Sequence, residues 1–558
     1  MTRWFDVGWL VLWGALSSAW CLTAAQDLSA TFDEPFYLRA GLRSWRSGSN
    51  WELMRAGAMP VPIDCEYLPI YLWERIRGEP FDTETDFHKI LPYARSVNLL
   101  FWWLQLTYGM LLARTFGGPW AGRFSIVLQA TEPSFLGHAC LATTDISVTG
   151  LLLAFTYHYY HGRDAGRVRR WLLPGILYGI SMAAKASALT FVPFIMLAIE
   201  VPRWYAAGAF SPPPGVGRLR HFWRATSLLR WDGLKILTVG MIVLWGYCGC
   251  DWRPQQSFVK WADGLPEDCR WRDEMRWVAH NLKVFPNAGE GLMYQIKHNI
   301  RGHGAAILGE YYPRAIWYYF PVALSIKLTL PVIGLLLGLL LFRPRSLFNP
   351  LSLAVLFLLI FSLNCRVQIG VRIVFPVVAL LLVTLSVGLA RTSEKWAPGP
   401  RWATLLALSA ICAYPAIAVW PDGMRYGNEL WGGTENTHRH LAEANYDWGQ
   451  GIYDLDRWTA ARGLPPAKVW YYGMDPLMGN DPERLLALHW PKYAIETPAD
   501  TWKHVRGHVV AVGVSMLYGN PNLSPTMGNV IEFFRHQTPI GRTRNFFVYD
   551  FREAGSPP

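Results

Sequence analysis

The stretch Ala30-Thr31-Phe32-Asp33-Glu34-Pro35-Phe36-Tyr37 sets two adjacent carboxylates just beyond an apolar run, from Val7 to Ala25. A bilayer core is about 30 Å thick and a helix rises about 1.5 Å per residue, so this run is long enough to cross it. A cleaved signal peptide ending near Thr23-Ala24-Ala25 is the alternative. We favour a membrane span, because many further apolar segments follow.

The composition is that of an integral membrane protein. Of the 558 residues, 52% are hydrophobic and only 17% are charged, and there are 29 tryptophans. The formal net charge is +11, but most Lys and Arg residues lie between apolar segments, where they are typical of cytoplasmic loops facing anionic lipids. We therefore expect contact with membrane lipids and no nucleic-acid partner.

The apolar segments predict a polytopic α-helical membrane protein with about eleven spans and an inner amino terminus. A continuous helix over 172–200 would place Lys185 near the middle of the bilayer, so we expect two short helices with Lys185 at the turn between them. After the first run, the other spans are predicted at 94–113, 121–137, 141–160, 234–250, 316–342, 349–363, 371–390 and 402–420.

The chain is predicted to have two domains. Residues 1–420 would form a transmembrane catalytic domain with two long outer loops, 26–93 and 251–313. After residue 421 the apolar runs stop, and a small α/β domain outside the cytoplasm is expected from residues 421–558. Its strands are predicted at 467–473, 508–514 and 545–549, and its helices at 445–463 and 482–488.

Basic residues at or within the predicted spans are candidates for binding an anion at the outer face. Lys185 could instead extend its charge to the membrane interface, and Arg372 could contact a lipid headgroup. Lys327 lies within an apolar helix, which makes it a functional candidate by default. The full set of candidates is Lys185, Lys327, Arg366 and Arg372.

Acidic residues near the outer face are the second group of candidates. Asp33 and Glu34 could cap the following helix or pair with Arg39, but a carboxylate here could also act as a general base. Asp145 begins a span, where an N-cap role competes with a role in the site. His138 is more typical of an interfacial histidine than of a ligand.

The eight cysteines show no C-x-x-C unit of the kind that binds zinc. Cys65 and Cys269 fall in predicted outer loops and Cys250 ends the span before the second of these loops, so all three could lie on the oxidising face, where a disulfide is permitted. A divalent metal held by Asp33, Glu34 and His138 is conceivable, but nothing in the spacing demands it. We predict no metal site and no certain cofactor.

Several motifs, in this order along the chain, resemble the GT-C superfamily of glycosyltransferases that use polyprenyl-phosphate sugars. The resemblance is to the protein O-mannosyltransferase and aminoarabinose-transferase branch. The motifs are Phe32-Asp33-Glu34-Pro35, Thr143-Thr144-Asp145, Gly179 to Ser187, Trp317 to Pro331, Ile369-Gly370-Val371-Arg372 to Pro376, Asn445-Tyr-Asp447-Trp448-Gly449-Gln450, and Tyr472-Gly473 to Pro476.

The resemblance implies an inverting-type glycosyltransferase of the bacterial cytoplasmic membrane, acting at its outer, periplasmic face. Asp33 would be the catalytic base and Glu34 its support, and the four basic candidates would bind the donor phosphate. Asp145, His138, Glu66 and Tyr67 would orient the substrate. The sequence departs from the family in the first outer loop, 26–93, where the family's His-Pro-Pro motif is replaced by Glu66-Tyr67-Leu68-Pro69.

The donor implied by the resemblance is a sugar on undecaprenyl or dolichyl phosphate, and the acceptor is an unknown glycan, lipid or protein. Some GT-C enzymes need a divalent cation and the O-mannosyl branch does not. A polyprenyl-lipid transporter or flippase is the alternative from another class, since it would share the spans and buried cations. A catalytically silent subunit of a membrane complex is a third reading.

Overall fold

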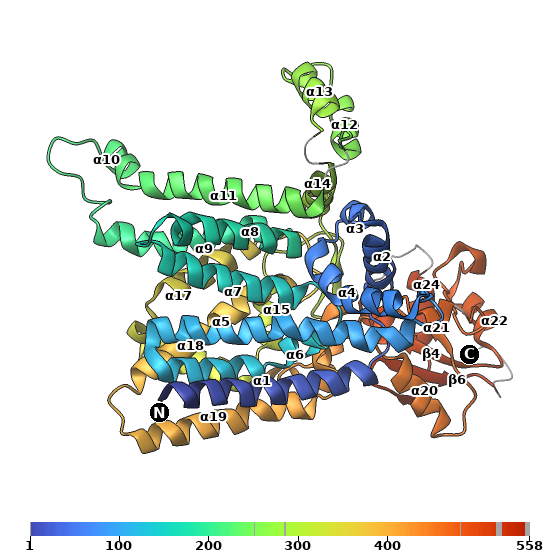
Figure 1. Cartoon of the computed structure of the whole chain (residues 1–558). Coiled ribbons are helices and arrows are strands. Elements are labelled where there is room, and N and C mark those ends of the chain that lie inside the picture. Colours follow the sequence, from blue (N-terminus) through green and yellow to red (C-terminus); the bar gives the residue numbers. More distant parts are fainter. Residues whose placement is uncertain (1, 250–251, 284–285, 480, 520–526, 553–558) are drawn as a thin grey trace.

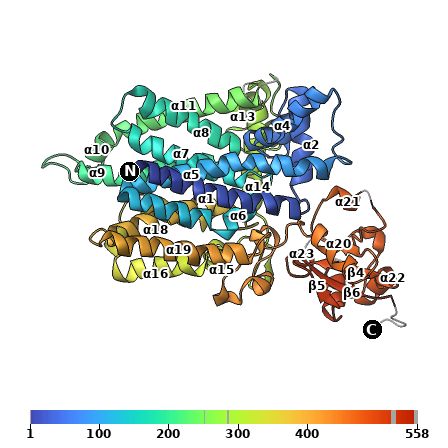
Figure 2. The same cartoon turned by 60° about the horizontal axis from the view of Figure 1, so that its bottom comes forward.

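The computed structural model describes residues 2–249, 252–283, 286–479, 481–519 and 527–552. Most of the long helices lie side by side, and a mixed α/β region covers one end of the bundle (Figures 1 and 2). Among the described residues, four helices are long and apolar enough to cross a membrane, or five if one bent pair counts as a span. The larger number of about eleven spans stays a prediction.

The first two helices place the acid pair. α1 (Thr2–Asp27) contains the predicted span, and α2 (Glu34–Ser47) begins directly after Asp33, which occupies its N-cap position. Pro35 lies in the first turn of α2, where its missing N–H costs no hydrogen bond. α3 (Trp51–Arg55) and α4 (Pro60–Arg77) follow within the predicted outer loop.

The second and third predicted spans form α5 (Phe87–Ala130), two helical segments joined at Gly118, where φ is 74° and ψ is −171°. The second segment ends at Ala130 rather than at residue 137. Glu132 is extended and Pro133 begins a separate short helix, α6 (Pro133–Ala139), because the residue before a proline is biased away from helix. α7 (Asp145–Gly162) follows.

The break predicted at Lys185 is confirmed. α8 (Leu173–Ala184) ends before it, Lys185 itself is extended, and α9 (Ala188–Ala206) begins three residues later. α10 (Arg218–Ala225) connects to α11 (Ser227–Cys248), which packs against α8. A Cβ added to Gly179 in α8 would lie 2.6 Å from the carbonyl oxygen of Gly240 in α11. The close approach of these two helices therefore requires glycine at position 179.

The span predicted over 316–342 is not one continuous helix. α15 (Tyr319–Lys327) and α16 (Leu330–Phe342) meet at an angle of 113°. Leu328 and Thr329 are extended, and Pro331 lies in the first turn of α16, where proline is favoured. Lys327 therefore lies at a helix end rather than within a continuous apolar helix.

The remaining helices of the bundle complete its core. α18 lies against α5 and α7, and its residues from Phe375 to Ala390 are nearly all buried. The central core contains large side chains such as Trp102, Phe124 and Phe155. These last helices are α17 (Pro350–Ser362), α18 (Phe375–Thr392), preceded by a 3-10 turn at Val371–Val374, and α19 (Pro398–Ala418).

The predicted outer loop 251–313 contains helices as well as a small hairpin. The helices are α12 (Gln256–Asp263), α13 (Arg272–Asn281) and α14 (Pro286–Arg301), and the antiparallel strands are β1 (Ala305–Ile307) and β2 (Glu310–Tyr312). Cys65 and Cys269 are free thiols. Cys250, the third cysteine considered for a disulfide, lies outside the described residues.

The carboxyl-terminal region contains a four-stranded sheet in the order β3-β4-β6-β5. β3 and β4 are parallel, and the other pairs are antiparallel. Side chains alternate between two cores, with Trp470 and Val510 on one face and Val469 and Ala511 on the other. The strands are β3 (Lys468–Trp470), β4 (Val509–Gly513), β5 (Gly541–Arg542) and β6 (Phe546–Asp550).

The strand predictions are confirmed, whereas one of the two helix predictions is wrong. α20 (Ile452–Ala460) lies within the predicted 445–463, but 482–488 forms turns, and Leu485 makes a β-bridge to Val469. The domain boundary at 421 and the location outside the cytoplasm stay predictions. The other short helices are α21 (Pro476–Gly479), α22 (Trp502–Val505), α23 (Val514–Tyr518) and α24 (Met527–Arg535).

Candidate active site at the junction of two cavities

Asp33 lies where two cavities meet. Its side chain is 28% exposed, and it lines both a cavity of about 680 Å³ and a smaller one of about 360 Å³. Tyr37, one helical turn later in α2, lines both cavities too, and its hydroxyl lies 3.5 Å from Asp33 Oδ2. A carboxylate in this position can contact molecules in either cavity.

The smaller cavity combines cations at one end with a largely apolar wall. Lys185 and Arg372 line it together with Asp33. The apolar wall is built from α9, α14, α17 and the segment before α18, and includes Leu189, Phe191, Leu292, Ile296, Ile300, Phe361, Ile369 and Ile373. The shape and chemistry suit an anion attached to an apolar chain.

The larger cavity lies between α2 and the carboxyl-terminal region and has a more polar lining. Carboxylate, guanidinium, hydroxyl and amide groups alternate with aromatic rings around it. These residues include Phe32, Phe36, Arg39, Thr83, Glu84, Gln295, Tyr471, Asp475 and Trp490. Aromatic faces beside hydrogen-bonding groups suit an amphipathic, hydroxylated ligand.

Charged groups link Asp33 to residues far away in the sequence. Arg372 Nη1 lies 3.7 Å from Asp33 Oδ2 and 3.6 Å from Asp145 Oδ2. Lys185 Nζ forms a direct ion pair with Asp145 Oδ1, and His138 Nδ1 lies 3.8 Å from Asp145 Oδ2. Lys185, Arg372, Asp145 and Asp33 thus form one cluster of charges. Asp33 is its most accessible member.

Trp448 supports the guanidinium of Arg372, whose Cζ lies 4.0 Å from the centroid of the ring. This cation–π contact fixes the plane of Arg372 and limits its motion. The Arg372 Nε–H is buried and has no acceptor among the described residues, so a bound anion could supply one. In the sequence, Trp448 stood out only as part of the motif from Asn445 to Gln450, which did not predict this contact with Arg372.

The residues before Asp33 are fixed by the segment that contains Trp448. The Phe32 N–H donates to the Trp448 carbonyl at 2.9 Å, and the Ser29 N–H donates to the Gln450 carbonyl at 3.1 Å. Gly449 has a φ of 99°, and a Cβ there would lie 2.9 Å from Gly473 Cα. The approach of this segment to residues 29–32 therefore places Asp33 and Trp448 in the same site.

Burial raises the pKa of the Asp33 carboxyl above its ordinary value of 3.8. The charge of Arg372 opposes this effect, Asp145 adds to it as a like charge, and Lys185 and the Tyr37 hydroxyl lower the pKa again. A carboxylate with a raised pKa is a stronger base than an exposed one. The environment thus favours proton uptake by Asp33.

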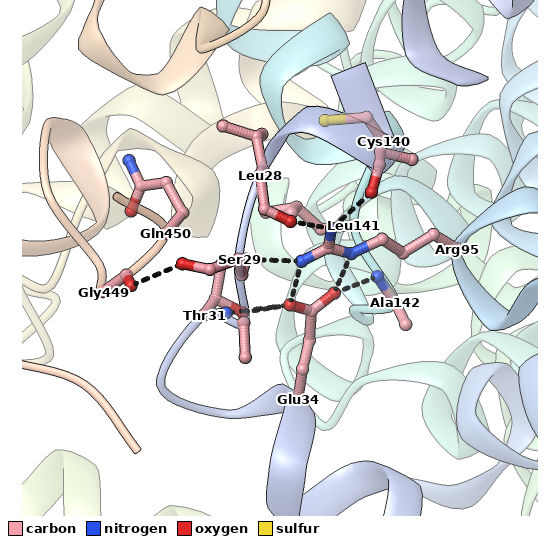
Figure 3. Close-up of polar contacts among 12 residues, drawn as sticks. Leu28, Ser29, Thr31, Glu34, Arg95, Cys140, Leu141, Ala142, Gly449 and Gln450 are labelled. Carbon is pink, nitrogen blue, oxygen red and sulfur yellow. Dashed lines mark hydrogen bonds and ion pairs between the residues drawn. The ribbon is translucent and has the colours of Figure 1, made fainter. Parts of the chain in front are cut away.

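Glu34, the adjacent acid, lines neither cavity and has no exposed surface. Arg95 donates to both of its carboxylate oxygens, at 2.8 and 2.7 Å (Figure 3). Glu34 also accepts hydrogen bonds from the backbone N–H groups of Thr31 and Ala142. The geometry gives Glu34 a positioning role, which supports Asp33 by fixing the chain on either side of it.

Lys327 is turned away from both cavities. Its ammonium group is buried and donates to three carbonyls, those of Met424, Tyr426 and Asn445, at 2.6, 2.6 and 2.9 Å. Because all three protons are used, the geometry argues against the predicted contact with the donor phosphate. Arg366 also lies outside the two cavities, and its Nη1–H donates to the Ile300 carbonyl.

The other predicted substrate-orienting residues lie behind the cavities rather than in them. Glu66 and Tyr67 of α4 are fully buried, and neither the Glu66 carboxylate nor the Tyr67 hydroxyl has a hydrogen-bond partner among the described residues. Burial raises the pKa of Glu66 well above its ordinary value. His138 is buried beside Asp145, with its ring 5.0 Å from that of Phe375.

A metal site built from Asp33, Glu34 and His138 is not supported by their positions. Glu34 is taken up by Arg95, and His138 contacts Asp145 instead. In the part of the chain that the structure describes, no group of three or more His, Cys, Asp or Glu residues could hold a metal ion. The four groups that do come together are Asp33, Asp145, Lys185 and Arg372.

No protein-family model and no curated protein sequence matches this chain. The crystal structure of ArnT from Cupriavidus metallidurans bound to undecaprenyl phosphate has a TM-score of 0.46 and 12% identity, with 97% of each chain covered. Its apo structure gives 0.45 and 13%, with the same coverage. The Archaeoglobus fulgidus oligosaccharyltransferase, crystallised with Zn and sulfate, gives 0.34 and 14%, covering 71% of this chain and 49% of that one. A function for this chain therefore rests on its own residues.

Proposed function

We propose that this chain is a membrane glycosyltransferase of the GT-C type, which transfers a sugar from a polyprenyl-phosphate carrier to an acceptor hydroxyl. The observation that carries the proposal is the position of Asp33. Its carboxylate joins a cation-containing, largely apolar cavity to a polar and aromatic one, with Arg372 3.7 Å away. A general base that acts between a donor and an acceptor must reach both binding sites, and Asp33 lines both cavities.

The smaller cavity would hold the donor. A polyprenyl phosphate has an apolar chain and an anionic head, which match the apolar wall and the cations Lys185 and Arg372. The planar fork of Arg372 can donate two parallel hydrogen bonds to a phosphate, and Lys185 can supply a second positive charge. The sugar would then lie at the end of the cavity that Asp33 lines.

The larger cavity would hold the acceptor. Its hydroxyl would attack the anomeric carbon from the side opposite the phosphate, so the configuration inverts. A new C–O bond forms, the bond from the anomeric carbon to the phosphate oxygen breaks, and the hydroxyl proton passes to Asp33. The carrier phosphate departs with the bonding electron pair, and Arg372 and Lys185 would stabilise its negative charge.

Two further residues would position the reacting groups without touching them. Trp448 holds the plane of Arg372, and Glu34 fixes the backbone beside Asp33 through Arg95. We place the reaction at the outer face of a bacterial cytoplasmic membrane, supported by the basic short loops predicted on the opposite side. The carboxyl-terminal region lines the larger cavity through Tyr471 and Asp475 and would help to bind the acceptor.

The test is turnover of a radiolabelled polyprenyl-phosphate sugar by purified protein in lipid nanodiscs, with membrane extract as the source of acceptor. We expect carrier release that Asp33→Asn abolishes. Asp164→Asn is the matched control, because Asp164 is 79% exposed and pairs with Arg203 rather than with the site. Movement of the intact lipid across a vesicle membrane without bond cleavage would instead indicate a transporter. If a strain with Asp33→Asn kept the full function of a membrane complex that contains this chain, the chain would be a catalytically silent subunit.

A further inference from the structure

α12 and α13 form a hairpin that stands apart from the bundle. In Figure 1 the long helices lie horizontally, whereas this hairpin stands above α11, near the end of α11 that lies beside α14. Figure 2 shows it at the same level along the bundle. If the long helices cross a membrane, the hairpin extends sideways from the bundle, beyond its perimeter. Lipid rather than protein would then lie beneath it.

The hairpin exposes three large aromatic side chains. Trp261, Trp271 and Trp277 are 44%, 58% and 69% exposed. The two helices are held together by Asp263 of α12, which pairs with Arg276 and His280 of α13, while Ala262 and Ala279 are fully buried. Tryptophan is enriched at the membrane–water interface, because its ring is apolar and its N–H finds a polar partner there.

The end of α11 that lies near the hairpin also exposes apolar side chains. Ile242 and Tyr247, near the outer end of α11, are 58% and 41% exposed, as expected for a helix that faces lipid. The ring of Trp245 lies 6.4 Å from that of Trp252, at the start of the hairpin segment. The start of the hairpin segment therefore lies against the end of α11.

We propose that the α12–α13 hairpin is a membrane-surface element, which rests on the phospholipid headgroups at the same end of the bundle as the two cavities and inserts Trp261, Trp271 and Trp277 at the interface. Residues 252–283 contain six Lys or Arg and five Asp or Glu, so the segment is nearly neutral. Binding through aromatic side chains rather than net charge does not require anionic lipid. The partner is a phospholipid surface, zwitterionic or anionic.

The hairpin is connected to the wall of the smaller cavity. α14 follows α13 in the chain and lies against α12, and its residues Leu292, Gln295 and Ile296 line that cavity. An attachment of the hairpin to the bilayer surface would hold α14 at a fixed height relative to the lipid. This inference concerns the contact with lipid and does not depend on sugar transfer.

A photo-crosslinking amino acid provides the test. The full-length chain is produced with p-benzoylphenylalanine in place of Trp271 or Trp277, reconstituted into nanodiscs of phosphatidylcholine that carries an alkyne tag, and irradiated. The same substitution at Ile242 on α11 is the positive control. Ile540 is the negative control, because it is 50% exposed in the carboxyl-terminal region.

We expect lipid adducts at both hairpin positions in a yield similar to that at Ile242 and at least about tenfold above that at Ile540. The yield should change little when half of the lipid is phosphatidylglycerol. Adducts at the level of Ile540 would overturn the proposal. Repeating the irradiation in native membranes tests whether the hairpin contacts a protein partner instead. Protein adducts in place of lipid adducts would overturn the proposal too.

Discussion

Arg95 and Glu34 form a bidentate ion pair, and neither side chain has any exposed surface. Arg95 also donates to the carbonyls of Ala25, Leu28 and Ser29, so one guanidinium holds both the end of α1 and the start of α2 (Figure 3). The turn between the two helices is thereby fixed, and Asp33 is held at the cavity. The two adjacent acids thus have different surroundings, since Glu34 is buried in an ion pair and Asp33 lines both cavities.

The first prediction concerns this ion pair. Glu34→Ala should lower the free energy of unfolding by about 3–5 kcal/mol, because it leaves the Arg95 guanidinium buried without a counter-charge. The measurement is thermal or denaturant unfolding of the purified protein in detergent. Glu52→Ala is the control, since its pair with Arg43 is exposed and should contribute at most about 1 kcal/mol. Equal losses for both variants would contradict the positioning role of Glu34.

The second prediction concerns the proposed contact between Arg372 and the donor phosphate. Arg372→Lys keeps the charge but loses the planar fork and its stacking on Trp448, so kcat/KM for the donor should fall by about 10²–10³-fold. Arg366→Lys, six residues earlier, should leave turnover unchanged, because Arg366 lies outside both cavities. Steady-state kinetics with a polyprenyl-phosphate sugar measures both. A comparable loss in the two variants would argue against the placement of the donor phosphate.

The third prediction separates Lys327 from Lys185. Lys327→Met removes hydrogen bonds to three buried carbonyls and should lower the free energy of unfolding by about 3 kcal/mol. The fraction that folds should keep its KM for the donor. Lys185→Met should instead raise that KM with a smaller effect on stability, because Lys185 lines the smaller cavity and is 20% exposed. Thermal unfolding and donor kinetics on the same preparations distinguish the two.

Part of this site could be predicted from the sequence. The acid pair after the first apolar run indicated Asp33, and the cost of burying a charge in the bilayer indicated the helix break at Lys185. Tyr37 could have been found as well, because it lies four residues after Asp33 and therefore on the same face of α2. These features depend on local spacing alone.

The rest depends on contacts between distant segments. Lys185 and Lys327 both lie in apolar surroundings, and the carbonyls that bind Lys327 come from residues 424–445, about a hundred positions later. Likewise, Trp448 reaches Arg372 only because the 3-10 turn at Val371–Val374 meets the turn at Glu443–Asn445. No periodicity in a single sequence encodes such a meeting.

The last prediction uses the pKa of Asp33, which burial raises above 3.8 and the charge of Arg372 lowers. As a general base Asp33 must be ionised, so kcat/KM should fall as the pH drops through this pKa. Arg372→Gln removes the lowering influence, so the acid limb of the pH profile should move to higher pH. Asp145→Asn removes a like charge that raises the pKa, so the limb should move to lower pH. Each profile is normalised to its own maximum, which separates the position of the limb from loss of rate. Shifts of the two variants in the same direction would mean that another group than Asp33 controls the limb.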